Sequence, residues 1–376
     1  MYWRHEYVRE AVAMPLGGEY KLDLPQRGQL CSLFLRITGS TISGASAAAE
    51  DWRIIDEISK IEVKGDGATV IKSITGYEAQ ALAFFDQGVI PQGRWANYAA
   101  NSVQEHMLIN FGRFLYDPEF GLNLERFNNV ELVITNAATA GGATDWSDLT
   151  VSVLAVYKEE HGAYPGYFRT EEWRAWTTLA DETKYNDLPL EGALRRVLVQ
   201  AIPDVDAAEV EETNMSNLMD DVEFWLDTGR TRVYKGGIDD LMRLDHLYNG
   251  RPILTGGALS FTADQGVDIS LGYVYAAAWG AGSQDGAGAA TIPTLEWSRT
   301  SFTQKPETSE ADSPIAALFL GIAPFMCVQL PYADPFDPAQ YLDLRSRSTV
   351  SLNIHTRNNA SAADGRNAII LDRLMV

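Results

Sequence analysis

The chain has 376 residues, of which 46% are hydrophobic and 10% aromatic, a composition typical of globular proteins. At about 150 residues per domain, the length predicts two or three domains, each able to bury a core. Acidic residues (51) outnumber basic ones (30), which gives a net charge of −21. Because phosphate binding depends on Lys and Arg, this charge argues against direct, sequence-specific binding of nucleic acid.

Residues 1–20 are expected to form an N-terminal arm. Residues 1–6 lack the apolar core of a signal peptide. Within residues 6–14, Val8 and Val12 would share one face of a helix, so a short helix is predicted there.

Alternating apolar residues predict strands through much of the following chain. In the first half, strands are expected at residues 22–39, 103–114, 130–134 and 149–157. Residues 58–63 and 69–74 flank the turn Gly65-Asp66-Gly67 and predict a hairpin. Segments with helical spacing, bounded by Gly, are expected at residues 76–88 and 237–250.

A whole-domain repeat runs through the sequence. The turn Asp117-Pro118 and the strand that follows it recur at Asp337-Pro338 with a constant offset of 220 residues. Asp23-Leu24-Pro25 recurs as Asp187-Leu188-Pro189, and Ile61-Glu62-Val63 resembles Val222-Glu223-Phe224, in the same order. Such ordered self-similarity indicates two copies of one unit. Evenly spaced strands with Gly and Pro turns predict an all-β protein of two tandem eight-stranded jelly-roll sandwiches with a few short helices.

The repeat suggests domain boundaries. We expect an arm (1–20), a first jelly roll (21–165), a linker (166–186) and a second jelly roll (187–376). Thr170 is expected to cap a linker helix carrying Trp173 and Trp176. The second copy is longer, with 86 residues at 251–336 against 28 at 89–116, so we expect an inserted surface protrusion around 251–310. Its Gly-rich tip would lie at 280–288.

Two apolar features have more than one interpretation. Cys31 and Cys327 lie in apolar strands and are expected to be buried free thiols, with a bridge between them as the alternative. The uncharged segment 313–333 is long enough to span a membrane, but three prolines interrupt it. We therefore expect two strands, at 315–323 and 325–330, that return into the core.

The sequence has no strong catalytic, cofactor or metal motif, so no site residues and no cofactor are assigned and no enzyme activity is expected. The histidines lack metal-ligand spacing; they are His5, His106, His161, His246 and His355. The Gly-rich segment 280–286 precedes no predicted helix and is not a dinucleotide-binding loop.

Several acidic residues and two asparagines allow weaker hypotheses. One acidic group could hold Ca²⁺ but is expected to be a solvated loop; it comprises Asp204, Asp206, Glu209, Glu211 and Glu212. Asp220-Asp221 and Asp239-Asp240 could act as glycosidase carboxylates, although sequence spacing does not give their separation in space. Asn214 and Asn359 begin formal glycosylation sequons.

The repeated segments also resemble a known family, the double jelly-roll major capsid proteins of tailless icosahedral phages. The resemblance rests on Leu24-Pro25 with Gly28, Ile61-Glu62-Val63, the turn 117–122, Asn128-Asn129-Val130 and the segments 166–173 and 233–237. It covers residues 20–250 and 336–356.

The resemblance implies a homotrimer of pseudo-hexagonal outline that builds an icosahedral virion shell, made in the host cytoplasm. Partners would be neighbouring capsomers, with penton or minor capsid proteins and an internal membrane as further candidates. The basic and aromatic residues of the arm, Arg4, His5, Arg9 and Lys21 with Tyr2, Trp3 and Tyr7, would then face the capsid interior.

The alternative is a secreted carbohydrate-binding or carbohydrate-active β-sandwich. Such a protein needs an aromatic platform, for which the sequence offers Trp173, Trp176, Trp225, Trp279 and Trp297. The duplication without a catalytic cluster favours the structural role.

Overall fold

The computed structural model describes most of the chain, with gaps at several connections. The residues it describes are 1–41, 54–91, 93, 102–140, 146–160, 162–202, 215–249, 253–261, 267–270, 273–282, 301–304, 313–357 and 365–376.

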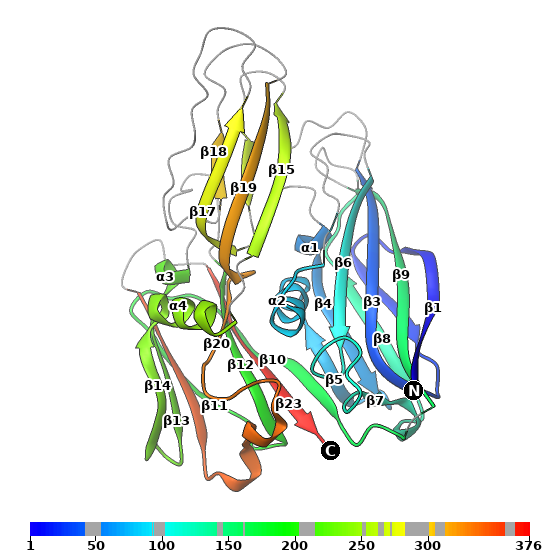
Figure 1. Cartoon of the computed structure of the whole chain (residues 1–376), viewed down its shortest axis with the longest axis vertical. Coiled ribbons are helices and arrows are strands. Elements are labelled where there is room, and N and C mark those ends of the chain that lie inside the picture. Colours follow the sequence, from blue (N-terminus) through cyan, green and yellow to red (C-terminus); the bar gives the residue numbers. More distant parts are fainter. Residues whose placement is uncertain are drawn as a thin grey trace.

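Two sheets face each other in the first half of the chain, here called the first lobe (Figure 1). One sheet has the order β1(Tyr2–Met14)-β9(Trp146–Glu159)-β3(Gln29–Thr41)-β6(Ser102–Asn110), with the short β7(Leu122–Asn123) also paired to β3. The other has the order β2(Gly18–Asp23)-β8(Val130–Asn136)-β4(Ile58–Gly65)-β5(Thr69–Ile74). Along β4, Ile61 and Val63 are fully buried whereas Glu62 and Lys64 are only partly buried, so the alternating pattern sets which face meets the core.

The second half, the second lobe, repeats this arrangement strand for strand. One sheet has the order β10(Tyr167–Thr177)-β23(Arg366–Met375)-β12(Ala193–Ile202)-β20(Cys327–Gln329), with β21(Leu342–Asp343) also paired to β12. The other has the order β11(Thr183–Asp187)-β22(Val350–Thr356)-β13(Met219–Leu226)-β14(Thr231–Gly237). The sequence predicts that the strands following the two Asp-Pro turns are equivalent. This is confirmed, because β8 lies between β2 and β4 just as β22 lies between β11 and β13.

Matching hydrogen bonds explain why the repeated residues recur. The N–H of Leu24 donates to the carbonyl of Val130 at 2.8 Å, and that of Leu188 donates to Val350 at 2.8 Å. Leu124, which begins the 3₁₀ turn η2(Leu124–Arg126), donates to the carbonyl of Gly28. Its counterpart in η5(Leu344–Ser346) donates to Gly192. Both glycines have positive φ values (122° and 71°), which side chains disfavour.

Among the described residues, four α-helices accompany the sheets: α1(Ile54–Glu57), α2(Gly76–Gln87), α3(Met215–Leu218) and α4(Ile238–Asn249). The helices predicted at residues 76–88 and 237–250 are α2 and α4, each directly after a hairpin. Thr75 and Glu78 form a capping box at the start of α2, and Gly88 ends it in the left-handed conformation.

The second lobe carries extra strands between α4 and β20. Three of them form a sheet with the order β15(Ile253–Phe261)-β19(Ser313–Pro324)-β17(Tyr273–Gly282), and β16(Val267–Ser270) pairs with β18(Ser301–Gln304). This extra sheet extends above the second lobe in Figure 1. The prediction that residues 315–330 return into the core is therefore half wrong: β20 pairs with β12, whereas β19 pairs with β15 and β17.

Two predictions about the connections were wrong. Residues 6–14 are not a helix, and they do not form a free arm: β1 pairs with β9 from Tyr2 to Met14. Residues 167–177 are not a helical linker, because β10 pairs with β23 over its length. Each segment is the first strand of its lobe, and the sequences agree at an offset of 165 residues: Tyr2-Trp3-Arg4-His5-Glu6 matches Tyr167-Phe168-Arg169-Thr170-Glu171.

The lobes are joined through a continuous sheet. β10 of the second lobe pairs in parallel with β5 of the first, with Thr170 opposite Lys72 and Glu171 opposite Ser73. The core of the first lobe extends across this junction, since Leu198, Phe325 and Ile370 pack in the same cluster as α2. The junction is called the seam below.

Candidate functional site at the seam between the two lobes

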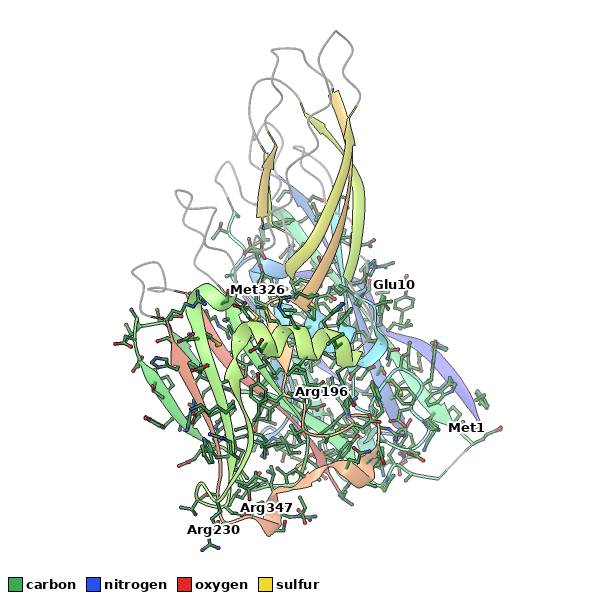
Figure 2. All side chains as sticks on the ribbon, turned by 60° about the vertical axis from the view of Figure 1, so that its left-hand side comes forward. Met1, Glu10, Arg196, Arg230, Met326 and Arg347 are labelled. Carbon is green, nitrogen blue, oxygen red and sulfur yellow. The ribbon has the colours of Figure 1, made fainter. Side chains whose placement is uncertain are left out.

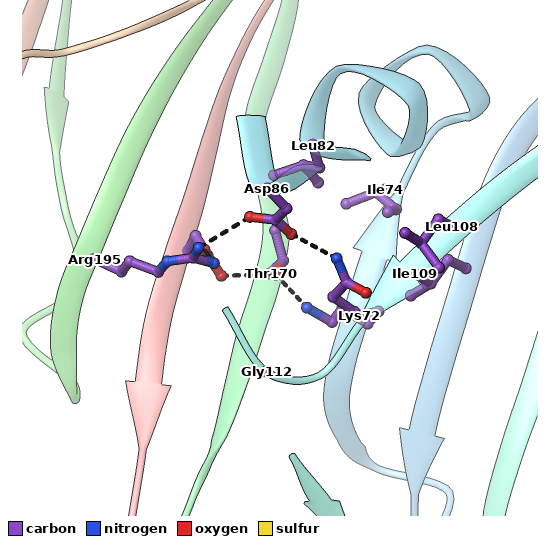
Figure 3. Close-up of a pocket in the computed structure, with 11 residues that line it drawn as sticks. Lys72, Ile74, Leu82, Asp86, Leu108, Ile109, Gly112, Thr170 and Arg195 are labelled. Atoms are coloured by element: carbon purple, nitrogen blue, oxygen red, sulfur yellow. Dashed lines mark hydrogen bonds and ion pairs between the residues drawn. The ribbon is translucent and has the colours of Figure 1, made fainter. Parts of the chain in front are cut away.

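A set of charged residues, unusual for a protein interior, is buried at the seam. Lys72 comes from β5, Asp86 from α2, Arg195 and Arg196 from β12, and Asp372 from β23. Both lobes therefore contribute, and Figure 3 shows Lys72, Asp86, Thr170 and Arg195 converging on one small cavity. This set, with Thr170, is called the seam network.

The seam network is a chain of short hydrogen bonds. The Nζ of Lys72 donates to Thr170 Oγ1 at 2.5 Å, and that hydroxyl donates to Asp372 Oδ1 at 2.8 Å. Arg195 then bridges the two carboxylates, with Nη1 at 3.0 Å from Asp372 Oδ2 and Nη2 at 2.9 Å from Asp86 Oδ1. Each carboxylate thus meets a cation, which buried charges require.

Burial and charge act in opposite directions on these groups. Burial lowers the pKa of Lys72 to about 8, although Asp372 and Asp86 partly oppose the shift. Burial acts to raise the pKa of Asp372, but Arg195, Lys72 and Arg196 outweigh it and hold that pKa below its ordinary value. Asp372 therefore stays charged, and Lys72 releases its proton more readily than a lysine in water does.

A second clamp extends the seam along the turn at Asp117. Arg113 places Nε at 2.7 Å from Asp117 Oδ2 and donates through Nη1 to the carbonyl of Phe336 in the second lobe at 3.1 Å. Arg195 donates back to the carbonyl of Arg113 at 2.7 Å. Aromatic rings fill the space around these bonds, with Phe114 against Phe336 and Phe120 against Phe168. An arginine from each lobe thus donates a hydrogen bond to a backbone carbonyl of the other lobe.

The seam has the chemistry of a structural clamp. A lysine beside a threonine hydroxyl is a pairing that also occurs in nucleophilic catalysis. The cavity between them, however, has a volume of only about 10 Å³, roughly the space for one water molecule. No organic substrate fits beside Lys72 and Thr170 in this arrangement.

A larger hollow of about 210 Å³ lies on the second lobe, over β11, β13 and β22. Its lining is polar and consists of Thr183, Tyr185, Asp221, Glu223, Asn353 and His355. Asp221 is one of the predicted candidate carboxylates, whereas Asp239 and Asp240 lie in the first turn of α4. The structure therefore does not bring the two predicted acidic pairs together in this hollow.

The described histidines form no common site. His5 contacts the hydroxyl of Tyr116 at 2.9 Å, and His106 stacks on Phe34 with ring centroids 5.3 Å apart. His246 lies in α4, and His355 lies 3.0 Å from Thr183 Oγ1. His161, the acidic group at 204–212 and the sequons at Asn214 and Asn359 lie outside the described residues. Within the described part of the chain, no cluster of three or more His, Cys, Asp or Glu side chains has a geometry suited to a metal.

The tryptophans do not supply the predicted aromatic platform among the described side chains. Trp173 and Trp176 are partly buried against the core of the second lobe, and Trp225 donates to Glu223 at 2.9 Å. The side chains of Trp279 and Trp297 lie outside the described residues. Cys31 and Cys327 are free and buried, as predicted. None of the described helices has the length and apolar character needed to cross a membrane.

The seam network was not predicted from the sequence, although the sequence contains one signal of it. Arg195-Arg196 interrupts the apolar strand from Leu194 to Val199, and Asp372-Arg373 interrupts the apolar run in β23. Charged pairs inside apolar strands require buried partners of opposite charge. The partners lie in the other half of the chain, so sequence patterns alone do not identify them.

By sequence, no family model and no curated protein matches this chain. Solved structures do match. The MCP of Sulfolobus turreted icosahedral virus (STIV) matches with a TM-score of 0.60 at 11% identity, covering 99% of this chain and 96% of that chain. The PBCV-1 virus capsid matches with a TM-score of 0.55 at 10% identity, covering 99% and 94%.

A third match is the major capsid protein P2 from bacteriophage PM2, with a TM-score of 0.50 at 13% identity, covering 100% of this chain and 98% of that chain. These similarities confirm the predicted fold: the chain has the double jelly-roll fold of viral major capsid proteins over nearly its whole length.

Proposed function

We propose that the chain is the major capsid protein of an icosahedral, tailless virus and resides in the virion shell. The observation that carries the proposal is the extent of the structural match. It includes both lobes and 96% of the STIV protein, so no large part of that capsid protein lacks a counterpart here. The fold alone does not dictate a function, and the arrangement of the lobes supplies the further argument.

The internal repeat supports a trimeric capsomer of pseudo-hexagonal outline. Each chain carries two similar lobes joined side by side, so three chains present six similar lobes. Closed rings form when a head-to-tail contact repeats through a rotation that closes. The seam network fixes the relation between the two lobes in each chain, which is the rigidity that a regular lattice requires.

The role is structural and not enzymatic. Lys72 is buried at the seam beside a cavity too small for an organic substrate. The structural matches named above are capsid proteins. Partners are other copies of the chain, with penton or minor capsid proteins and an internal membrane as further candidates. With a net charge of −21, the protein would not bind nucleic acid sequence-specifically.

The insertion around residues 251–310 would form a protrusion on the outer surface of the shell. Its support is the separate sheet β15-β19-β17, which extends away from the second lobe in Figure 1. Limited proteolysis of assembled particles tests this placement. Cleavage near residues 282–288 with intact shells is the expected result, and complete protection of that tip while other loops are cut would exclude it.

Negative-stain microscopy of the purified protein tests the function itself. Trimers of hexagonal outline, or closed shells, are expected. A protein that stays monomeric at micromolar concentrations and forms no shells under any assembly condition would contradict the proposal. A substitution that weakens trimers should lower the particle yield in parallel.

A further inference from the structure

Two strand edges remain open where the repeat predicts a neighbour. In the second lobe, the first strand β10 pairs on one side with β23 and on the other with β5 of the first lobe. Its counterpart β1 pairs only with β9, and β14, the counterpart of β5, pairs only with β13, among the described strands. Exposed edges of this kind readily accept a further strand.

Helices α2 and α4 show the same asymmetry. At an offset of 162 residues, the two helices bury equivalent positions against their own lobes; these are Gly76, Ala79, Gln80 and Ala83 in α2 and Ile238, Leu241, Met242 and Asp245 in α4. α2 buries a second stripe, including Leu82 (8% exposed) and Phe85 (3%), at the seam. The equivalent residues in α4, Leu244 and Leu247, are 44% and 75% exposed. An uncovered leucine stripe at i and i+3 is typical of a helix that lacks its partner surface.

The first lobe has the surface that would cover this stripe. At the seam, α2 packs on a sheet face that includes Leu198 and Ile370, which are fully buried. Their counterparts in the first lobe are Phe34 and Leu154, which lie opposite each other in β3 and β9. Both are only partly buried. In the part of the first lobe that the structure describes, Phe34 and Leu154 therefore lie on a face that lacks the helix covering the equivalent face of the second lobe.

Charge along the open edges is complementary. β1 and β10 share an internal ion pair, Arg4 with Glu6 and Arg169 with Glu171. The register of the seam, Glu171 opposite Ser73, places Glu6 opposite Lys235 when it is transferred to β1 and β14. Within one chain Glu6 pairs with Arg4 and Lys235 pairs with Glu223, but the side chains of Glu6 and Lys235 are 56% and 48% exposed and therefore accessible to a neighbouring chain.

We infer that each chain binds the next through a second copy of its own seam. The β14 edge and the α4 stripe of one protomer dock on the β1 edge and the β3-β9 face of its neighbour. Figure 1 shows β14 and β1 on opposite sides of the molecule, so the contact is head to tail and propagates around a ring. Figure 2 likewise shows Met1, which precedes β1, at the periphery, whereas Arg196 at the internal seam is fully buried. This inference rests on the proposed trimeric capsomer and names the residues that close it.

Disulfide trapping in the full-length chain tests the register. The double variant Glu6→Cys/Lys235→Cys should give covalent dimers and trimers on a non-reducing gel, and the series should stop at three chains. The native cysteines are buried and contribute no background. Each single variant should stay monomeric on the gel, and Glu10→Cys/Lys235→Cys is a control displaced along β1.

Light scattering of the same samples separates this inference from the proposed function. Trimers in solution that resist trapping at Glu6 and Lys235 would overturn the inference and leave the capsid role standing. Monomers would overturn both.

Leu247→Asp on α4 gives an independent test. It should raise the trimer dissociation constant by roughly tenfold or more, because a charge would enter an apolar contact. Leu179→Asp, at a site with 56% exposure outside this surface, should leave the dissociation constant unchanged. Equal effects of the two substitutions would also overturn the inference.

Discussion

The two copies of the Asp-Pro turn show what the seam adds to a repeated local structure. In both, the aspartate accepts a hydrogen bond from the backbone N–H two residues later, Glu119 at 2.9 Å or Ala339 at 3.0 Å. Asp117, however, is fully buried and bound by Arg113, whereas Asp337 is partly exposed and Ala333 occupies the position of Arg113. The repeated residues thus determine the shape of both turns. Arg113, which has no counterpart in the second copy, binds Asp117 and connects that turn to Phe336 in the other lobe.

The same division holds across the seam network. Lys72, Arg195 and Asp372 correspond to Tyr234, Cys31 and Val156 in the other lobe. The contact inside the chain is therefore charged, whereas the equivalent positions of the other lobe are apolar or aromatic, and the charges at the open edges are those of exposed residues such as Glu6 and Lys235. Buried ion pairs penalise wrong pairings more than they stabilise right ones, so the charged contact suits the permanent junction and the apolar one suits a contact between subunits.

Breaking the seam network should have the largest effect. Arg195→Met leaves Asp86 and Asp372 buried without their shared cation, so the free energy of unfolding should fall by about 3–5 kcal/mol. Urea denaturation followed by fluorescence measures the change. The matched control is Arg345→Met, because Arg345 pairs with Asp343 in solvent and its loss should cost about 0.5 kcal/mol or less. Similar losses in both variants would contradict the special role of the seam.

The two turns give the next test. Asp117→Ala removes a buried carboxylate that holds Arg113, so a loss of about 3 kcal/mol is expected. Asp337→Ala removes the N-cap of the 3₁₀ turn η4(Pro338–Gln340) and an exposed hydrogen bond from Gln340, so a loss of about 1 kcal/mol is expected. Thermal unfolding of both variants measures the difference. If Asp337→Ala proves as damaging as Asp117→Ala, the repeated turn and not the arginine clamp dominates.

A pH titration tests the lowered pKa of Lys72 at the seam, at a position where the other lobe has Tyr234. Burial lowers the pKa of Lys72 from 10.5 to about 8, so between these values the unfolded chain holds a proton that the folded chain has released. Stability contributed by this group therefore rises as pH increases from 8 to 10.5, by up to about 3 kcal/mol. The rise should disappear in Lys72→Met when its unfolding free energy is compared with that of the unchanged chain across this window. Parallel pH profiles would show that Lys72 stays protonated in the fold.

The smallest expected effect concerns the start of α2. Thr75→Ala removes the hydroxyl that accepts from the N–H of Glu78, which should lower the free energy of unfolding by about 1 kcal/mol. Thr75→Ser keeps the hydroxyl and should be nearly neutral. The first residue before α4 is Gly237, which has no side chain to cap with, so α4 depends more on its packing. An unaltered stability in Thr75→Ala would show that packing also dominates α2.

The sequence predicted the fold where local patterns repeat. The hairpin at residues 58–74, the helix after it and the strand at 130–134 were identified correctly, because alternation and Gly boundaries are local signals. The first strands β1 and β10 were misassigned, since the apolar spacing of Val8 and Val12 fits a helix as well as a bulged strand. The shared pattern of Tyr2, Arg4 and Glu6 with Tyr167, Arg169 and Glu171 was the signal that the repeat extends to both.

Local sequence patterns do not predict the seam network, and the reason is physical. Lys72 and Asp372 are 300 residues apart in the sequence, and they meet only because β5 pairs with β10 and β10 with β23. Burial and ion pairing at such a site are products of tertiary packing, which local propensity does not encode. The charged pairs within apolar strands indicate that a partner exists without identifying it.

A density map of the purified assembly that resolves individual strands tests the central claim most directly. The account predicts three 41.5 kDa chains around one axis, with first and second lobes alternating and β14 of each chain beside β1 of the next. A two-fold dimer, or a ring in which like lobes touch, would contradict it.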